Sequence, residues 1–599
     1  MKRNVEDVMF ETVVDRRLMP HVPDPTGQRS SVDRRDNHLN DKSKAQYARY
    51  AGTRYKVKTP VKIRVDGIQT YMNGETIDVS QTGMLIDCGA NMLTSIKVGD
   101  KIKVRFRLKA GMLPEGAEQR YNVKGQIARV NLDAHICAIA FAKPLYRIRK
   151  QRTDRILFGL SAFLMGLTML IVLLMRVESV AYFPDRPLLY GYSILTALFL
   201  LSRYWFGMLY KPIPVDPDFT PSVTIVIPCF NEETWIRRTI LSCVDQEYPP
   251  EKLEFIIVDD GSSDNSVEVI KKTIEDLCRE GTRFNLAHRI RFFQQNYNQG
   301  KREAMGLGIR NARTELITFV DSDSFLEPDA IRNLVQPFHD PQMGGVAGRT
   351  DVANTYTNNL TRMQSVRYYI SFRMMKAAEA LFDSVMCLSG PLSCYRIEAV
   401  REVYDRWINQ MFMGQKATFG DDRSLTNFVV ENHRTYYQDT AICSTIVPNR
   451  HKKFLRQQMR WKRSWLRESL NAGKFIWRKE PFMSFFFYLG LLVPIIAPII
   501  VIYNLLYVPL AQHIAPTTFL LGLFMMALMM SFAQLALKKS SLWIHGLLFC
   551  LYYEAILLWQ MPWAWLTFWV NDWGTRGTGK KKETVPPQQN TAADEQSAA

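Results

Sequence analysis

The sequence predicts a helical membrane protein with a doubly wound α/β domain and, ahead of that domain, a small β-barrel. Apolar runs of membrane length stand on both sides of residues 220–450, and inside that stretch strand-like runs alternate with helix-like segments. Residues 50–146 instead contain short runs in which apolar and polar residues alternate, a pattern typical of strands with one buried face. At 599 residues the chain is long enough for three or four such units.

The net charge and the cysteine spacing limit what the chain can bind. Lysine and arginine exceed aspartate and glutamate by 76 to 58, a formal charge of +18. In a chain with apolar spans, this excess fits cytoplasmic loops that face anionic lipid. No basic helix or basic–aromatic motif supports nucleic-acid binding, so we expect none. The nine cysteines are scattered without paired spacing, which argues against both a disulfide framework and a zinc site.

We expect seven consecutive segments along the chain. They are a disordered, charge-mixed arm at 1–45, the β-barrel at 46–150, two transmembrane helices at 151–211, the α/β domain at 212–450, interfacial helices at 451–480, further transmembrane helices at 481–572, and a terminal segment with a low-complexity tail at 573–599. The arm has no apolar core, so we expect the first span to serve as the membrane signal.

Four apolar runs have the length needed to cross a bilayer: 156–175, 188–210, 482–510 and 517–537. A fifth run, 542–570, is too short for two full helices of about 20 residues each. Lysines before and after it nevertheless both favour the cytoplasmic side, which requires an even number of crossings. We therefore expect short or re-entrant helices that are broken at Pro562.

Acidic residues follow the predicted strands of the α/β domain. The runs 223–228, 255–260 and 315–321 are apolar enough for buried parallel strands. In open α/β sheets ligands bind beyond the carboxyl ends of the strands, where Asp260, Asp321 and Asp323 fall. The pair Asp321-x-Asp323 would share one face of an extended strand and suits Mg²⁺, which takes one or two protein carboxylates together with phosphate oxygens. We expect Asp260 to contact the base or ribose of a nucleotide.

Further residues predict transfer of a sugar from a nucleotide diphosphate. The glycine turn at 298–302 presents Lys301 and Arg302 to phosphate. An acceptor hydroxyl needs a general base, for which we select Asp422, with its neighbour Asp421 in support. We expect Arg460 to stabilise the leaving diphosphate and Trp461 to stack on a pyranose.

Residues 220–470 resemble the processive family-2 glycosyltransferases, and the hyaluronan synthases in particular. The similarity lies in Val226–Glu232, Asn298–Arg302, Ser389–Arg396, Gly420–Asn427, Gln457–Trp461 and Trp573–Arg576. It implies a GT-A-like fold, an inverting hexosyl transfer from a UDP-sugar with Mg²⁺ or Mn²⁺, and spans that form an export channel for the growing polysaccharide. It further implies that Ser389, Gly390, Pro391 and Trp461 bind the acceptor, and that Gln457, Gln458, Trp573 and Arg576 lie at the nucleotide-sugar site.

The segment 78–83 in the barrel, Asp-Val-Ser-Gln-Thr-Gly, resembles a signature of PilZ domains, which are receptors for cyclic di-GMP. The resemblance implies that Asp78, Ser80 and Gly83 bind guanine edges and that Arg49 and Arg54 bind phosphates. PilZ domains have two arginines with three residues between them, whereas four residues separate Arg49 from Arg54 here. We expect cyclic di-GMP to act as an allosteric activator.

These features favour a processive, multi-pass exopolysaccharide synthase and exporter in a bacterial inner membrane, with the barrel and the catalytic domain in the cytoplasm. Periplasmic or outer-membrane export proteins are further expected partners. One alternative is a mannuronan (alginate) synthase that uses GDP-mannuronate, because the barrel resembles those of alginate polymerisation systems. The others are a catalytically inactive cyclic di-GMP sensor and a non-processive enzyme that makes a lipid-linked sugar. The sequence does not specify the sugar, since single pocket contacts decide donor choice.

Overall fold

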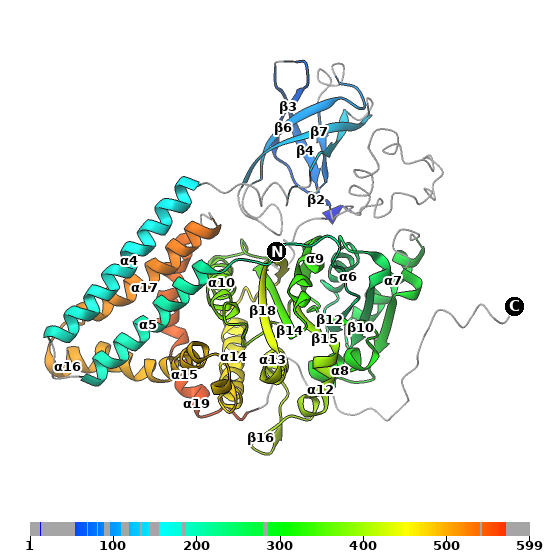
Figure 1. Ribbon diagram of the computed structural model, residues 1–599. Coiled ribbons are helices and arrows are strands. Elements are labelled where there is room, and N and C mark those ends of the chain that lie inside the picture. The colour runs from blue at the N-terminus through cyan, green and yellow to red at the C-terminus, as the bar shows by residue number, and fades with distance from the viewer. Residues whose placement is uncertain are drawn as a thin grey trace, which may run out of the picture.

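A computed structural model describes the barrel, a set of apolar helices and the α/β domain (Figure 1). The described residues are 12–13, 54–68, 70–80, 82–88, 96–108, 119–131, 135–143, 145, 155–182, 187–279, 286–538 and 542–570. The predicted arm and the terminal segment from 573 onward lie outside these ranges, apart from residues 12–13.

The amino-terminal unit is a closed barrel of six antiparallel strands. These are β3 (Pro60–Val65), β4 (Met72–Val79), β5 (Gly83–Asp87), β6 (Lys101–Leu108), β7 (Gln119–Asn131) and β8 (Ile136–Phe141). Their order is β4-β3-β6-β7-β8-β5, and β5 pairs with β4 to close the ring. Two short strands, β1 (Thr12–Val13) and β2 (Arg54–Lys56), extend the sheet from β4. The alternating apolar residues point inward, as Val61 and Ile63 do, so the predicted barrel is confirmed.

The α/β domain is built on one eight-stranded mixed sheet. Its strands are β9 (Val223–Cys229), β10 (Leu253–Asp259), β11 (Ile290–Gln294), β12 (Leu316–Phe319), β13 (Ser324–Leu326), β14 (Met343–Val352), β15 (Ser393–Arg396) and β18 (Arg434–Thr445), in the order β11-β10-β9-β12-β15-β14-β18-β13. The first four strands are parallel, and three of them, β9, β10 and β12, coincide with the runs predicted as parallel strands. β15 is antiparallel to both of its neighbours, and β13 is an antiparallel edge strand.

Helices cover both faces of this sheet, which is the doubly wound arrangement expected from the sequence. One face packs against α6 (Ile236–Val244), α7 (Ser266–Arg279) and α9 (Ala330–Leu334), and the other against α8 (Lys301–Asn311), α12 (Ile397–Ile408) and α13 (Asp421–Asn432). Side chains of β10 alternate between the two cores: Phe255 and Ile257 enter the first, and Ile256 and Val258 the second. Both faces of the strand are therefore buried, which explains its unbroken apolar run.

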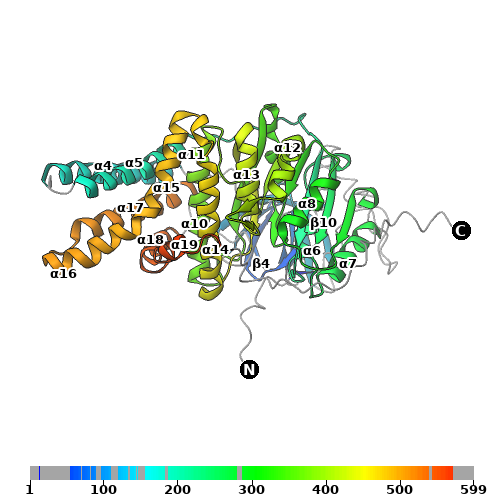
Figure 2. The same cartoon turned by 90° about the horizontal axis from the view of Figure 1, so that it is seen from below.

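Apolar helices gather on one side of the α/β domain (Figures 1 and 2). They are α4 (Arg155–Tyr182), α5 (Pro187–Leu209), α15 (Pro481–Ile502) with its continuation through Tyr503–Tyr507 into α16 (Val508–Gln512), α17 (Thr517–Lys538), α18 (Trp543–Tyr552) with Tyr553–Leu557, and α19 (Gln560–Trp565). Among the described residues, three stretches are long and apolar enough to cross a membrane: Gly191–Leu209, Pro481–Gln512 and Phe519–Lys538.

The run 542–570 forms short helices, but the break differs from the expected one. α18 and its π-helical extension end at Leu557, and α19 begins at Gln560, so the chain turns before Pro562. Pro562 lies in the first turn of α19, where the missing N–H would have no partner within the helix in any case.

The remaining helices join these parts. They are α10 (Asn359–Ile370), the π-helix Ser371–Lys376, α11 (Ala377–Ala380), α14 (His451–Ala472), and the short 3₁₀ turns Pro250–Lys252, Leu286–His288, Gln336–His339 and Ile476–Arg478. A two-stranded hairpin, β16 (Met411–Phe412) and β17 (Gln415–Lys416), completes the domain.

Candidate active site

The site forms where the strand order of the sheet reverses. β10 and β11 lie on one side of β9, whereas β12 lies on its other side. A crevice opens at the carboxyl ends of strands around such a point. Asp260 follows β10, and Asp321 and Asp323 follow β12, so the structure brings these predicted residues to one edge of the sheet.

Asp260 organises the loop that precedes α8. Its carboxylate accepts hydrogen bonds from the main-chain N–H of Gln299 at 2.7 Å and of Gly300 at 3.0 Å. Gly300 has a φ of +102°, a conformation that favours glycine, and α8 starts at the next residue. Asp260 therefore fixes the point at which Lys301 enters the cavity, while its side chain also lines that cavity.

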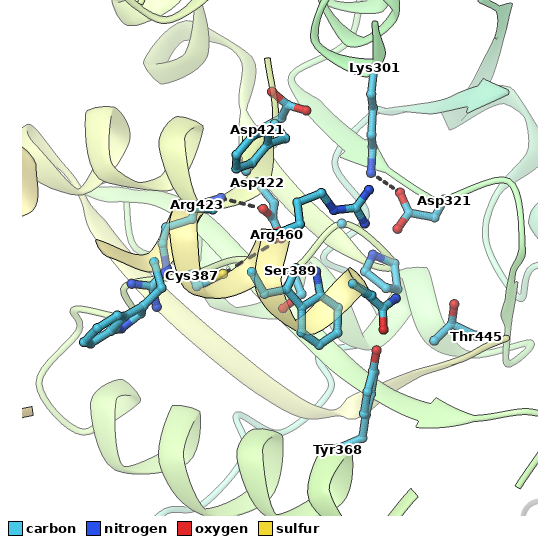
Figure 3. Close-up of a pocket in the computed structure, with 18 of the residues that line it drawn as sticks. Lys301, Asp321, Tyr368, Cys387, Ser389, Asp421, Asp422, Arg423, Thr445 and Arg460 are labelled. Carbon is cyan, nitrogen blue, oxygen red and sulfur yellow. Dashed lines mark hydrogen bonds and ion pairs between the residues drawn. The ribbon is translucent and has the colours of Figure 1, made fainter. Parts of the chain in front are cut away.

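Lys301 forms an ion pair with Asp321 inside the cavity (Figure 3). Burial would lower the pKa of Lys301, but the charges of Asp321 and of the more distant Asp422 outweigh it and raise that pKa. The lysine is therefore held as a cation. Gly390 leaves the space for this pair, since a Cβ there would lie 2.9 Å from Nζ of Lys301 and 3.0 Å from Oδ2 of Asp321.

Asp323 lies in a turn, because Ser324 N–H donates to the carbonyl of Asp321 at 2.9 Å. The expectation that Asp321 and Asp323 share a face of an extended strand is thus wrong, although the turn still directs both side chains into the cavity. The hydroxyl of Thr445 donates to Asp323 at 3.2 Å. Among the described residues, no cluster of three or more His, Cys, Asp or Glu could hold a metal by itself. Two carboxylates nevertheless fit a Mg²⁺ or Mn²⁺ ion whose remaining ligands are phosphate oxygens and water.

The two adjacent carboxylates Asp421 and Asp422 have different surroundings. Asp421 is 3% exposed and accepts from Nε of Arg302 at 2.8 Å. The guanidinium of Arg302 also donates to the carbonyl of Trp407 and to Gln410. Arg302 is not among the residues that line the cavity, so it holds Asp421 instead of offering itself to phosphate.

Asp422 faces the cavity beside groups that the sequence did not single out (Figure 3). Its carboxylate accepts from the main-chain N–H of Arg423 and lies 3.9 Å from the thiol of Cys387. Nearby, Nζ of Lys376 donates to Oγ of Ser389 at 2.5 Å. Burial lowers the pKa of Lys376 and raises that of Cys387. A carboxylate in this place can accept a proton from a hydroxyl that enters between Ser389 and Asp422.

α14 supplies the remaining predicted residues. Gln457, Gln458, Arg460 and Trp461 all line the cavity. Arg460 points toward Asp321 and Lys301 (Figure 3). The Trp461 ring has Arg367 5.6 Å from its centroid and Tyr368 at 6.3 Å, so three planar groups cluster there. In the described part of the chain, the buried Oε1 of Gln457 has no hydrogen-bond partner, and a bound hydroxyl can satisfy it.

The cavity continues from this site to the apolar helices. It has a volume of about 660 Å³ and is lined by Asp260, Asp321 and Asp323 of the sheet edge and also by Pro494, Tyr553 and Met561. Pro494 belongs to α15, a candidate membrane span, and Met561 to α19. Lys462 of α14 also lines the cavity, and burial lowers its pKa to about 7. One continuous space thus joins the carboxylates of the sheet to the helices beyond.

A buried network holds the two motif-bearing helices together. Gln410 donates to Glu468 at 3.1 Å and accepts from Arg302 at 3.1 Å, which connects α14 to α8. Glu468 is 1% exposed and pairs with Arg467, whose guanidinium donates to the carbonyl of Phe419, just before α13. Sequence reasoning missed Gln410, Arg467 and Glu468 because no local motif marks them and most of their partners lie far along the chain.

The structure places the remaining predicted residues as follows. Ser389, Gly390 and Pro391 line the cavity near Asp422. In the barrel, Asp78 is 4% exposed, and the hydroxyl of Ser80 donates to the carbonyl of Gly83 at 3.0 Å, so that hydroxyl supports the turn. The backbone of Arg54 lies in β2, but its side chain is outside the described part, as are Arg49, Trp573 and Arg576.

Comparison with known proteins agrees with this geometry. Residues 224–404 match the model of the glycosyl transferase family 2, residues 316–571 that of the glycosyl transferase family group 2, and residues 43–159 that of the PilZ domain. The chain carries a family-2 glycosyltransferase domain and a PilZ domain. The PilZ domain is the closed barrel, and the glycosyltransferase domain contains the cavity.

Curated relatives are similar to somewhat less than half of this chain. The hyaluronan synthase of Streptococcus pyogenes serotype M3 is 35% identical over 289 residues, 47% of this chain and 66% of that relative. The N-acetylglucosaminyltransferase of Rhizobium sp. (strain N33) is 37% identical over 263 residues, 43% of this chain and 56% of that relative. This chain thus spans somewhat less than two thirds of the relatives it matches. The solved mannosyltransferase PcManGT from Pyrobaculum calidifontis is 20% identical over 65% of this chain and all of its own, with a TM-score of 0.44.

Replacement of Asp421 by Asn should destabilise the glycosyltransferase domain, because it leaves the buried cation of Arg302 without its counter-charge. We expect the free energy of unfolding to fall by about 3–5 kcal/mol. Asp422→Asn is the matched control: it changes a cavity-facing carboxylate and should alter stability by less than about 1 kcal/mol. Thermal unfolding in detergent, followed by tryptophan fluorescence, measures both. Equal losses in the two variants would contradict the separate roles assigned to the two carboxylates.

Proposed function

We propose that this chain is a membrane-embedded processive polysaccharide synthase. It transfers sugars from a nucleotide-sugar, in the first place a UDP-sugar, to a growing β-linked exopolysaccharide and exports that polymer. The observation that carries the proposal is that one cavity is lined both by Asp321, Asp323 and Trp461 and by Pro494 and Tyr553, which belong to the apolar helices. The intact Gln457–Trp461 segment, and the apolar helices on both sides of the glycosyltransferase domain, count against a non-processive enzyme with a lipid-linked product.

The residues of the cavity divide the reaction between them. Asp422 accepts the proton of the acceptor hydroxyl, so that this oxygen can attack the anomeric carbon as the bond to the diphosphate breaks. Lys301 and Arg460 balance the negative charge that remains on the leaving diphosphate. Trp461 offers a flat apolar surface to the acceptor ring. Asp321 and Asp323 would hold a divalent cation, which supplies further charge neutralisation to the diphosphate when bound.

Arg367, Lys376, Arg423 and Lys462 line the cavity, together with the acidic residues Glu379, Asp421 and Asp422. Burial lowers the pKa of Arg367, Lys376 and Lys462, and a bound carboxylate would favour their charged forms. This charge supports an acceptor polymer that carries carboxylates. Either a UDP-uronate or GDP-mannuronate as donor would yield a polymer with carboxylates. The mannuronan synthase alternative therefore stays open. The complete set of acidic residues in the cavity disfavours an inactive sensor.

The location follows from the same elements. The three long apolar stretches and the cations that flank them favour a multi-pass protein of a bacterial inner membrane, with the barrel and the glycosyltransferase domain on the cytoplasmic side. α14 would lie at the interface, since its basic and aromatic residues alternate with buried ones. Export proteins of the periplasm or outer membrane would receive the polymer.

Cyclic di-GMP is the proposed activator. The PilZ domain supports this proposal, since Asp78 is placed by a β-bulge between Thr76 and Asp78, directly before the turn formed by Ser80 and Gly83. A close approach of strands makes glycine necessary at 83, where a Cβ would lie 2.4 Å from the carbonyl oxygen of Ile139. Arg54 lies in β2 opposite Val13 of β1, near the edge of the same sheet. Its side chain would contact phosphate.

Transfer can be tested with purified full-length protein, Mg²⁺, cyclic di-GMP and a panel of UDP- and GDP-sugars that includes uronates. We expect release of the nucleoside diphosphate with one or two donors, and loss of this release when the divalent cation is chelated. In Asp422→Asn the rate of release should fall by about 10²–10⁴-fold. Asp405→Asn, an exposed carboxylate change on α12, is the control. Turnover of Asp422→Asn within twofold of the parent would overturn the proposed role of this carboxylate.

Activation by cyclic di-GMP is tested separately. The dinucleotide should raise the rate of transfer by about 5- to 150-fold, the usual range of allosteric coupling. Arg54→Ala should abolish this increase and leave the basal rate, because Arg54 belongs to a strand of the barrel and not to the glycosyltransferase domain. Asp66→Asn, an exposed change elsewhere on the barrel, should respond like the parent. Equal rates with and without the dinucleotide in the parent would remove the regulatory proposal and leave the enzymatic one intact.

A further inference from the structure

One wall of the PilZ barrel presents basic side chains in a regular array. The basic wall consists of Lys62 and Arg64 of β3, Lys101, Lys103, Arg105 and Arg107 of β6, and Arg120 and Lys124 of β7. These residues alternate with buried apolar ones, so they point outward from the barrel. The three strands contain no aspartate or glutamate, and they lie side by side (Figure 1).

The strand register places like charges directly opposite one another. Lys103 is the partner of both Arg64 on β3 and Lys124 on β7, and Arg107 is the partner of Arg120. Residues paired in this way project from the same face, and like charges in such pairs weaken a sheet. A surface that served solubility alone would mix the two signs. The array therefore indicates a function in binding an extended anionic partner.

Two of the arginines are held in place by an aromatic ring. The guanidinium carbons of Arg105 and Arg64 lie 4.6 and 5.3 Å from the centroid of Tyr71, which precedes β4. Contacts of this kind restrict long side chains, and less conformational entropy is lost when such a side chain binds an anion. The centre of the basic wall is thus ordered before any partner arrives.

The chain keeps this wall close to the apolar helices. Residues 146–154 connect Leu145, which packs on the barrel, to the start of α4 at Arg155. A connection of this length spans at most about 35 Å even when fully extended. If α4 lies in a bilayer, as proposed above, the barrel is confined within that distance of the lipid surface, so the effective concentration of lipid head groups around it is high.

We propose that the basic wall binds the anionic head groups of the bilayer that contains the apolar helices. The bilayer surface is extended, negatively charged and within reach, and attraction between it and basic residues acts over about 8–10 Å at physiological ionic strength. Binding would orient the barrel at the membrane. The inference rests on the proposed membrane location but not on the proposed transferase chemistry.

The test compares full-length protein in lipid nanodiscs of pure phosphatidylcholine and of phosphatidylcholine with 30% phosphatidylglycerol, by mild acetylation and mass spectrometry. Lys62, Lys101 and Lys124 are exposed and serve as reporters, and Lys271 and Lys272, exposed on α7, are the internal control. We expect at least threefold slower acetylation of the reporters in anionic nanodiscs, reversal at high salt, and no change at the control lysines.

A variant separates specific binding from a general surface effect. Arg64→Gln with Arg105→Gln should remove most of the protection at Lys101 and Lys124, whereas the matched double change Arg406→Gln with Arg434→Gln, on the glycosyltransferase domain, should leave it. Equally fast acetylation of the reporter lysines in both lipids would overturn the proposal. Equally slow acetylation in both lipids would overturn it too, since the wall would then be covered by the protein itself. Neither readout uses sugar transfer, so failure of the proposed enzymatic function is seen independently.

Discussion

The geometry of the site depends on one buried polar network that ties α8, α13 and α14 together. Arg302 and Glu468 are its two charged centres, and Gln410 connects them, with each of the three nearly removed from solvent. Breaking one of these contacts would leave a buried charge without its partner, which is unfavourable, so the network favours this arrangement of the three helices. That arrangement sets the position of Asp422 relative to Trp461, which lie on different helices. In the proposed reaction this packing fixes where the base Asp422 and the acceptor at Trp461 would meet.

A second set of charges joins the sheet to the apolar helices. Lys538, the last residue of α17, pairs with Asp351 of β14 at 3.0 Å. Arg349 of the same strand pairs with Asp439 of β18, and Arg373 donates to the carbonyl of Gly207 in α5. β18 ends at Thr445, whose hydroxyl bonds Asp323. The wall of the cavity and the helices beyond it are therefore parts of one packed body, and the cavity can keep its continuity between them.

Much of this architecture follows from local patterns in the sequence. Continuous apolar runs mark β9, β10 and β12 because both faces of these strands are buried, and parallel strands bring the acidic residues after them to one edge. The glycine before Lys301 and the residues Gln457–Trp461 of α14 could be identified because each belongs to a short local motif. The structure shows these residues around one cavity, as the predicted nucleotide-sugar site requires, although their roles stay predictions.

Other features depend on distant pairings that no local pattern reveals. Arg302 seemed suited to phosphate because it follows Lys301, yet its partner Asp421 lies 119 residues further on. At Asp323 the chain turns, and Thr445 of the distant strand β18 donates to its carboxylate, whereas the apolar run before the pair suggested that the strand continues. Lys376 reaches the cavity from a π-helical segment, a local irregularity that the sequence does not mark.

The most direct test is a cryo-EM structure of the Asp422→Asn chain in lipid nanodiscs with a UDP-sugar, Mn²⁺ and an oligosaccharide acceptor. We predict nucleotide density at Asp260, Asp321 and Asp323, and sugar density that continues past Trp461 between Pro494 and Tyr553 into the apolar helices. Sugar density that leaves the cavity away from the apolar helices, or a nucleotide bound away from these carboxylates, would contradict the account.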